Sequence, residues 1–352
     1  YNATVAPSVR SSEALVQAQR AAVLATEQDV LLTAATSYLE VVQDQAVLTL
    51  AINQEQVLRR NLEAARDRFR VGEYTRTDVS QSESRLAEAT ANRIASEGTL
   101  QVSRARYERA IGSRPGELKA PKPTFKLPKT LDSAVEMARG NNPAVIAASF
   151  NEEAQRQTVD QLYGNLLPSA NVSASGSTVL DPSSSGTTID RTDSLSVRAQ
   201  VVIPLYQAGL PEARVREAKQ TANQYRIQIE DTRRQAVEAA ISAWQSLATA
   251  RASIASYRSQ ISAAEIALEG VRQEAQVGSR TVLDVLNQEQ ELLNARVNLV
   301  RAQRQEMVAA FQLLSAIGAL AAQQLNLPVE YYEMGAHYER VRGKWWGTGI
   351  DE

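Results

Sequence analysis

The 352-residue chain contains no cysteine and one histidine, His337. Without cysteine there is neither a disulfide nor a thiolate metal site. His337 stands near Glu333 and Glu339, but one nitrogen ligand without a second nitrogen or a thiol does not make a zinc site. The same scarcity excludes most histidine-based catalysis. We therefore expect no catalytic residues, no metal site and no cofactor.

Long apolar runs, strong charge and aromatic residues are also scarce. No run of about 18 apolar residues occurs, so the sequence predicts no transmembrane helix. The formal net charge is −2, which gives no bulk attraction to nucleic acid or acidic lipid. Aromatic residues make up 5% of the chain, whereas alanine, glutamine, glutamate, arginine and valine are abundant. This composition favours long helices with small contact surfaces over a thick globular core.

A very long helical pattern occupies residues 11–70. Leu58, Leu62 and Ala65 are spaced by four and three residues, which places them on one stripe of a helix. Phe69, four residues later, extends the stripe. A helix of about 60 residues is roughly 90 Å long. Such a length predicts a coiled-coil arm rather than an element of a compact domain.

Gly72 is the first glycine of the chain and is expected to end this helix, because glycine adopts a positive φ without a Cβ clash. A second helix is predicted from Thr75 or Thr77 to about Ile111. Short connections between long helices make the helices antiparallel neighbours. The first half of the chain therefore predicts a helical hairpin with residues 71–78 at its tip.

The period of the pattern changes in the middle of the chain. After a linker rich in proline and lysine, residues 113–131, two short helices are predicted over 131–139 and 143–163. Residues 168–179 and 194–205 then alternate between apolar and hydroxyl-rich positions, as strands do. Strands of about 10 residues with this alternation and a polar loop are typical of outer-membrane barrels. A soluble hairpin packed on a helix is the alternative.

The second half repeats the first at an offset of 206 residues. V-G-S-R-T-V-L-D-V at residues 277–285 matches V-G-E-Y-T-R-T-D-V at residues 71–79. The offset holds without a gap, since A-I-G at residues 316–318 aligns with A-I-G at residues 110–112. A pattern repeated in register indicates two copies of one structural unit. We therefore predict a second hairpin, whose first helix covers residues 210–276.

These patterns divide the chain into five segments. Tyr1 aligns near Tyr206, so the first copy lacks a strand pair before its long helix. We expect roughly a hundred residues, including that strand pair, to precede Tyr1 in the natural protein. The segments are a first helical hairpin (1–112), a linker with short helices (113–166), an outer-membrane β-hairpin (167–206), a second helical hairpin (207–320) and an irregular aromatic tail (321–352).

Two helical hairpins with V-G-x-x-T-x-x-D-V at each tip, and P-L-Y-x-x-G at residues 204–209, resemble the TolC-type outer membrane factor family. The resemblance extends from Tyr1 to about Leu320. It implies a mainly α fold with a membrane β-hairpin, assembled as a homotrimer. The strands of three subunits would form one twelve-stranded β-barrel in the outer membrane of a Gram-negative bacterium. The duplicated coiled-coil hairpins would form one α-helical periplasmic tunnel.

The resemblance also implies a function. Members of the family are passive exit ducts of tripartite efflux or type I secretion systems. They dock onto a periplasmic adaptor (membrane fusion) protein, which joins them to an inner-membrane ABC or RND-type transporter. The sequence K-W-W-G at residues 344–347 is similar to members that serve type I secretion. Trp345 and Trp346 are expected to pack against the helices as part of a belt around the tunnel.

The aspartates at the tips have a local interpretation first. T-x-x-D is a helix-start pattern in which the threonine caps the helix and the carboxylate lies near its N-terminus. Thr75 with Asp78, and Thr281 with Asp284, fit this pattern. We expect the capping role for both aspartates, whether or not a functional role coexists with it.

By resemblance, the same tips constrict the tunnel entrance. Arg280 matches a constricting arginine, Asp78 matches its partner on the first hairpin, and Asp284 matches an acidic ring. Two positions depart from the family pattern. Ala275 stands where a constricting tyrosine is expected, and Asn287 stands where a second acidic ring is expected. We therefore expect a looser lock and weaker cation selectivity.

The tips also supply the residues that we expect to dock the adaptor. Val282 and Leu283, apolar at an exposed tip, favour a partner, although a turn with solvated residues is the alternative. Two other classes of protein compete with a channel. A periplasmic coiled-coil adaptor or a structural scaffold predicts no barrel, and an enzyme needs a reactive constellation that the sequence lacks. The docking candidates are Gly72, Glu73, Tyr74, Thr75, Arg76, Gly278, Ser279, Thr281, Val282 and Leu283.

Overall fold

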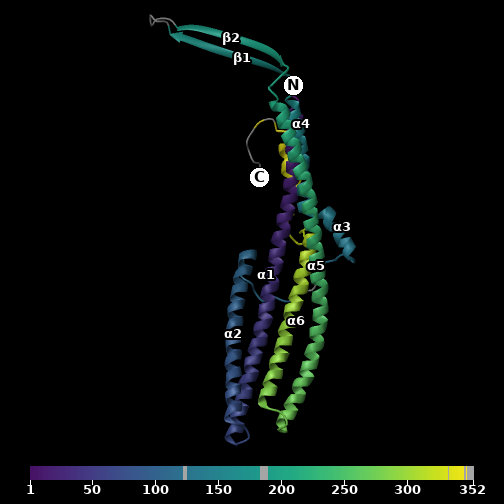
Figure 1. Cartoon of the computed structure of the whole chain (residues 1–352). Helices are drawn as coiled ribbons and strands as arrows, with labels where there is room; N and C mark the ends of the chain where they lie inside the picture. Colours follow the sequence, from purple (N-terminus) through teal and green to yellow (C-terminus); the bar gives the residue numbers. More distant parts are fainter. Residues whose placement is uncertain (122–124, 183–188, 332, 345, 347–352) are drawn as a thin grey trace. The chain divides into compact units, whose positions relative to one another are not determined.

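The computed structural model describes residues 1–121, 125–182, 189–331, 333–344 and 346. The chain divides into two compact units, one of residues 1–23 with 143–234 and one of residues 24–142 with 235–352. The elements of Figure 1, in order, are α1 (Val5–Arg70), α2 (Arg76–Ile111), α3 (Leu131–Asn141), α4 (Pro143–Gly164), β1 (Ser169–Pro182), β2 (Ile189–Val202), α5 (Leu210–Gln276), α6 (Val282–Ala316) and α7 (Met334–Val341).

The first unit contains α4, the first turns of α1 and α5, and the two strands. Its helices approach closely because small side chains meet at their contacts. Ala14 and Ala18 of α1 and Ala154 of α4 are buried, and the hydroxyl of Ser11 donates to the carbonyl oxygen of Ala154 at 3.0 Å. At Gly164, a Cβ would lie 2.9 Å from the backbone of residue 3, so this contact requires glycine.

The two strands form an antiparallel pair whose faces differ, as the alternation predicts. On one face, Val172 pairs with Ala199 and Ala174 with Val197. On the other, hydroxyl groups pair across the strands: Ser175 with Ser196 at 2.9 Å and Ser177 with Ser194 at 2.7 Å. The strands are offset by a few residues from the predicted ranges, and the loop at residues 183–188 lies outside the described residues. The predicted β-hairpin is confirmed.

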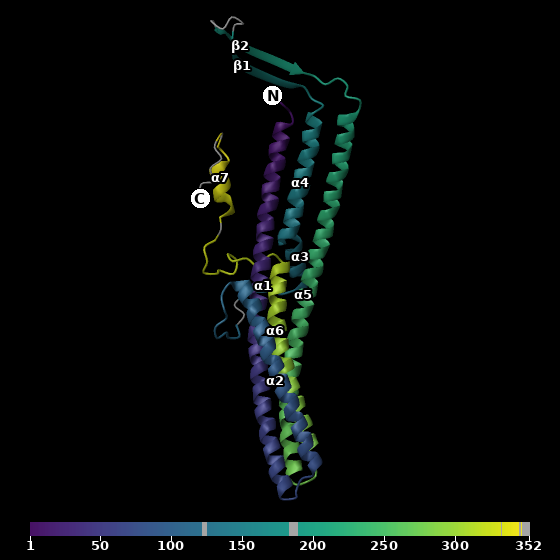
Figure 2. The same ribbon diagram turned by 90° about the vertical axis from the view of Figure 1, so that its left-hand side faces the viewer.

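The second unit holds two helical hairpins, as Figures 1 and 2 show. The first hairpin is α1 with α2, and the second hairpin is α5 with α6. Leu58, Leu62 and Ala65 of the predicted stripe are buried. Phe69 was expected to continue this buried stripe, but it is 45% exposed. It lies one residue before the end of α1.

The core of the second unit lies where α3 packs on the two helices of the second hairpin. It contains Ala134 and Ala138 of α3, Leu247 of α5, and Leu313 of α6. The α3–α4 junction reaches α6 as well, since the amide of Asn142 donates to the carbonyl oxygen of Ala316 at 3.0 Å. The short helix α3 is therefore held on the second hairpin by its buried alanines and by the hydrogen bond of Asn142.

Three expectations from the sequence are corrected at the ends of the chain. The first helix starts at Val5 rather than residue 11, because Pro7 falls in the first turn, where a missing N–H costs nothing. The tail is not wholly irregular, since it contains α7. Trp346 is 89% exposed and so does not pack on the helices of its own chain, whereas a belt shared by several copies stays a prediction. Trp345 lies outside the described residues. None of the described helices is long and apolar enough to cross a membrane.

Candidate gate and docking surface at the hairpin tips

Each hairpin tip turns at a glycine in the left-handed region. Gly72 has φ +82° and Gly278 has φ +80°. The residue after each glycine donates its N–H to a carbonyl five residues back, at 2.9 Å in both tips. This bond satisfies a carbonyl at the helix C-terminus and needs a residue that tolerates positive φ. The two tips therefore share one backbone design, as the sequence repeat predicts.

Both tips then start the next helix with a capping box, which confirms the helix-start interpretation of the aspartates. Thr75 caps α2, and its N–H and hydroxyl donate to Asp78 at 2.9 and 2.7 Å. Thr281 caps α6, and its N–H and hydroxyl donate to Asp284 at 3.0 and 2.8 Å. The bonds from Thr281, with the charge of Arg280, lower the pKa of Asp284 below its ordinary value.

In each tip, a side-chain contact joins two positions that match in the repeat. Arg68 matches Glu274, and Tyr74 matches Arg280. In the first tip, the Arg68 guanidinium donates to the Tyr74 hydroxyl at 2.7 Å and lies 5.2 Å from its ring centroid. In the second tip, Arg280 Nε donates to Glu274 at 2.9 Å. The bond and charge of Glu274, followed by the charge of Asp284, raise the pKa of Arg280. Arg280 thus has a local partner within its own hairpin.

The structure places the predicted gate residues at the tips without joining the two hairpins through them. In this single chain, Arg280 bonds Glu274, and Asp78 bonds its own cap, Thr75. The constriction predicted from the resemblance concerns several copies of the chain, so it stays a prediction. Ala275 and Tyr74, from opposite hairpins, line one cavity of about 200 Å³.

The docking candidates are mostly exposed, with two exceptions. Val282 packs against a buried apolar cluster, and Tyr74 is half-buried. Leu283 is 37% exposed. Sequence reasoning missed Val71 and Val277, which are 72% and 81% exposed beside the two glycines. The sequence repeat could have identified these two valines, because an apolar residue precedes the glycine in both tips.

The contacts between the two hairpins lie a little further along the helices. Leu58 of α1, Ala89 of α2 and Leu286 of α6 form a buried apolar cluster. Asn61 of α1 donates its amide to both oxygens of Glu289 of α6 at 3.0 and 3.1 Å. These residues were not among the predicted site residues, because a charged residue on a helix is usually solvated.

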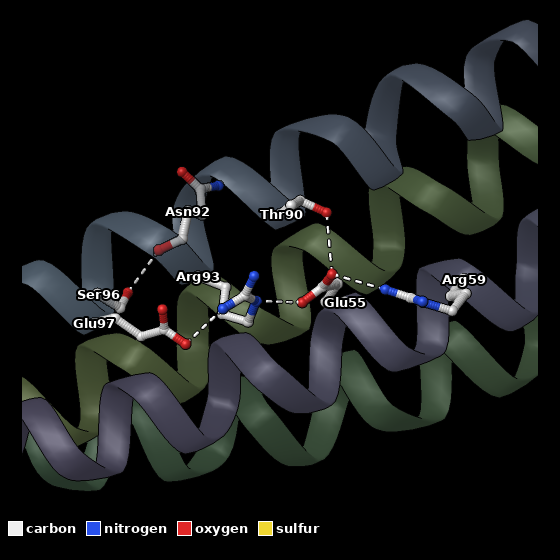
Figure 3. Close-up of polar contacts among 7 residues, drawn as sticks. All are labelled: Glu55, Arg59, Thr90, Asn92, Arg93, Ser96 and Glu97. Carbon is white, nitrogen blue, oxygen red and sulfur yellow. Dashed lines mark hydrogen bonds and ion pairs between the residues drawn. The ribbon is translucent and has the colours of Figure 1, made fainter.

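Figure 3 shows a second polar network, between the helices of the first hairpin. Glu55 of α1 is largely buried and accepts hydrogen bonds from Arg59 at 3.0 Å and from Thr90 at 3.1 Å. Arg93 of α2 donates to Glu55 and also to Glu97. The matching positions of the second repeat, 206 residues on, are an isoleucine and a leucine in place of Glu55 and Arg93.

The charge state of Glu55 is set by this network. Burial raises the pKa of its carboxyl, but the three hydrogen bonds, Arg93's above all, outweigh burial and lower the pKa. A carboxyl group with a lowered pKa stabilises the folded state above its ordinary pKa. That contribution is lost as the pH falls through the lowered value. At neutral pH the network therefore stabilises the contact between α1 and α2 of the first hairpin. The second hairpin has apolar side chains at the positions that match Glu55 and Arg93.

The chemistry of these sites is structural and electrostatic. Within the described residues, no group of three or more acidic, histidine or cysteine side chains is placed to hold a metal. The described residues thus combine long paired helices, tips that turn at a glycine, and a strand pair with one apolar and one hydroxyl-rich face.

Comparison with known proteins identifies the family. The model of the outer membrane efflux protein family matches residues 134–319, just over half of the chain. Outer membrane efflux protein BepC of Brucella suis biovar 1 (strain 1330) is 34% identical over 340 residues, which are 97% of this chain and 74% of BepC. The chain belongs to the outer membrane efflux protein family. It is an outer-membrane protein of Gram-negative bacteria with a periplasmic extension.

More distant relatives agree with this assignment. Outer membrane protein TolC of Escherichia coli (strain K12) is 25% identical over 312 residues, which are 85% of this chain and 63% of TolC. The crystal structure of outer membrane protein VceC from Vibrio cholerae is similar with a TM-score of 0.77 at 21% identity, over 90% of this chain and 76% of that chain. The likeness to VceC shows the fold, which confirms the mainly α architecture with a β-hairpin.

Proposed function

We propose that the protein is a passive exit duct in the outer membrane, which serves a tripartite efflux or type I secretion system. Three copies, each giving the four strands that the family resemblance implies, close into one twelve-stranded barrel above one helical tunnel. A periplasmic adaptor opens the tunnel at the helical tips, and an inner-membrane ABC or RND-type transporter supplies the energy. A periplasmic adaptor or scaffold is the alternative, but the strand pair has no role in it.

The observation that supports this proposal best is the exposure of the apolar strand face. Leu195, Val197 and Val201 are 82%, 72% and 66% exposed on one face of β2. Water is a poor solvent for such a face, whereas lipid is a good one. The opposite face carries paired serines, which suit a water-filled interior.

The same strands argue for assembly with further copies. The described sheet has two strands, so the outer edge of β2 has unpaired backbone groups. Unsatisfied backbone groups are not tolerated in the hydrocarbon region, and only a closed barrel satisfies them. Closure with further strands supplies the missing partners, which supports assembly into a barrel of several copies.

Channel activity is tested with the full-length protein in planar lipid bilayers. The wild-type protein is expected to conduct weakly, and Arg280→Ala is expected to conduct more because the mouth loses a constricting charge. Glu274→Gln is the matched variant, since it removes the local partner of Arg280 but keeps the cation. Equal conductance of Arg280→Ala and wild type would remove Arg280 from the gate. If Glu274→Gln alone raised conductance as much, the local bridge would be responsible.

Adaptor docking is tested at the apolar residue of the second tip. Leu283→Asp is expected to abolish pull-down of the adaptor while trimers still form, because Leu283 is exposed and stands outside the apolar cluster between the hairpins. The control is Ile266→Asp, which changes another exposed apolar residue, 73% exposed, on α5 away from the tip. Retained adaptor binding by Leu283→Asp would refute this docking site.

A further inference from the structure

The face of the strand pair that carries Val197 is apolar over most of its length and becomes polar at one end. Its apolar stretch consists of Ala170, Val172, Ala174 and Gly176 of β1 with Leu195, Val197, Ala199 and Val201 of β2. Toward the loop that joins the strands, Thr178 stands opposite Asp193, and Leu180 stands opposite Arg191. Two charged residues therefore follow the apolar stretch at the loop end of the strands.

The polar side chains at this end form one connected group. The Thr178 hydroxyl donates to Asp193 Oδ1 at 2.7 Å, and Arg191 Nε donates to the same carboxylate at 3.0 Å. The side chains of Arg191 and Asp193 are 64% and 58% exposed. The guanidinium is held through Nε, and its two Nη nitrogens make no hydrogen bond to the described residues. Arg191 therefore offers a fork of N–H donors to a further partner.

The spacing along the strands places Arg191 at the border of a bilayer. Ala170 and Leu180, which pairs with Arg191, are ten residues apart on this face. Ten residues of strand extend over about 33 Å. At the tilt of about 40° that outer-membrane strands have, this length covers about 25 Å of the membrane normal, which is the height of their apolar band. Arg191 thus lies at the edge of the band, with Asp193 about 7 Å nearer to its middle along the strand.

The order of the elements decides which border this is. At their other ends the strands continue into α4 and α5, which are helices. In the proposed exit duct the helices lie in the periplasm, so the loop end of the strands is on the external side. The inference therefore rests on the proposed function, because that function places the strands in the outer membrane.

Phosphate is the group that fits the fork of Arg191. A guanidinium binds phosphate through two parallel hydrogen bonds, and arginine is favoured for this reason where phosphate is recognised. The external leaflet of the outer membrane consists of a glycolipid, lipid A with its attached sugars, whose headgroup carries phosphates. A lipid whose acyl chains lie along the apolar strand face brings its headgroup to the depth of Arg191. Asp193 lies deeper, on the side of the acyl chains.

From this placement we propose that Arg191 binds a phosphate of the external-leaflet glycolipid at the rim of the barrel. Asp193 and Thr178 are positioning residues, since they hold the guanidinium through Nε and leave both Nη nitrogens to the phosphate. An exposed ion pair contributes only about 0–1 kcal/mol to stability, so the pair of Arg191 with Asp193 gains little as a structural contact alone.

The test measures binding of lipid A to the full-length protein in detergent by native mass spectrometry. The wild-type protein is expected to bind lipid A with both phosphates about tenfold more tightly than Arg191→Gln, equivalent to about 1.4 kcal/mol. Arg191→Lys should recover part of the affinity, because it keeps the charge without the fork. The matched control is Arg198→Gln, which removes an arginine from the hydroxyl-rich face of the same strand and should bind like wild type.

The positioning role of Asp193 has its own measurement. Asp193→Asn is expected to weaken binding of lipid A with both phosphates several-fold, and to leave binding of lipid A without phosphates unchanged. A general loss of structure would weaken both. Excess inorganic phosphate is expected not to displace the lipid, because free phosphate makes no contact with the apolar face. Displacement would indicate a site for free phosphate and would overturn the lipid assignment.

The headgroup site is overturned if Arg191→Gln binds lipid A as tightly as wild type, or if Arg198→Gln loses as much affinity. Equal binding of lipid A with and without phosphates by the wild-type protein would overturn it as well. Conductance in planar bilayers separates this site from the exit duct, since Arg191→Gln is expected to conduct like wild type. Conducting protein whose lipid binding ignores Arg191 would remove only the headgroup site. A wild-type protein that neither inserts nor conducts would remove both proposals.

Discussion

Replacing Gly318 with alanine is expected to destabilise the second unit far more than the same change at Gly112, its match in the first repeat. Both glycines follow a helix with positive φ, +75° and +85°, where alanine costs roughly 1–2 kcal/mol. A Cβ at Gly112 meets nothing within 4 Å, whereas a Cβ at Gly318 overlaps the backbone carbonyl of Asn141. Overpacking of this kind adds about 1–3 kcal/mol.

The atoms next to Gly318 cannot easily move to make room for a Cβ. The overlap is with backbone rather than with the end of a flexible side chain. The adjacent Asn142 donates its side-chain amide to the carbonyl oxygen of Ala316, two residues before the glycine, so residues 141 and 142 are held at the end of α6. Relief of the clash therefore requires α3 to leave its place in the core.

The measurement is thermal unfolding of each variant in detergent, followed by circular dichroism. Gly318→Ala should melt well below Gly112→Ala, which itself should melt slightly below wild type. Similar melting temperatures for the two variants would mean that the α3–α4 junction does not pack on Gly318 as the structure has it.

The helices and tips could be predicted because their signals are local. Gly72 and Thr75 determine where α1 ends and α2 begins through positive φ and a capping bond, and neither depends on distant residues. The strand faces followed from alternation alone. The start of α1 was missed because Pro7 usually breaks a helix but is tolerated in the first turn. The helix α7 has no comparable cap, since Glu333 makes no side-chain capping bond.

The contacts between hairpins could not be predicted in this way. Periodicity places Asn61 on a face of α1, but it does not say which helix covers that face. Glu55 and Glu289 look like solvated charges in the sequence, and their burial depends on donors from other helices. The repeat contained a usable signal, because Glu55 stands where the second copy has isoleucine. A charge at a position that is apolar in the other copy marks a contact special to one repeat.

Val197→Arg is expected to abolish assembly in the outer membrane. Val197 is 72% exposed at the middle of β2, on the apolar face and opposite Ala174. If this face meets lipid, an arginine near the bilayer midplane costs about 2–4 kcal/mol in each chain. A trimer carries this cost three times. We therefore expect trimers to be absent from the outer-membrane fraction, measured by fractionation and by gel electrophoresis without heating.

The neighbouring residue provides the control, because a strand turns alternate side chains to opposite faces. Ser196 lies on the hydroxyl-rich face, where its side chain bonds Ser175. That face already carries Arg198, two residues further on. Ser196→Arg should therefore insert and form trimers nearly as well as wild type. Equal insertion of Val197→Arg and Ser196→Arg would show that the apolar face does not contact lipid, and the exit-duct function would lose the observation that supports it best.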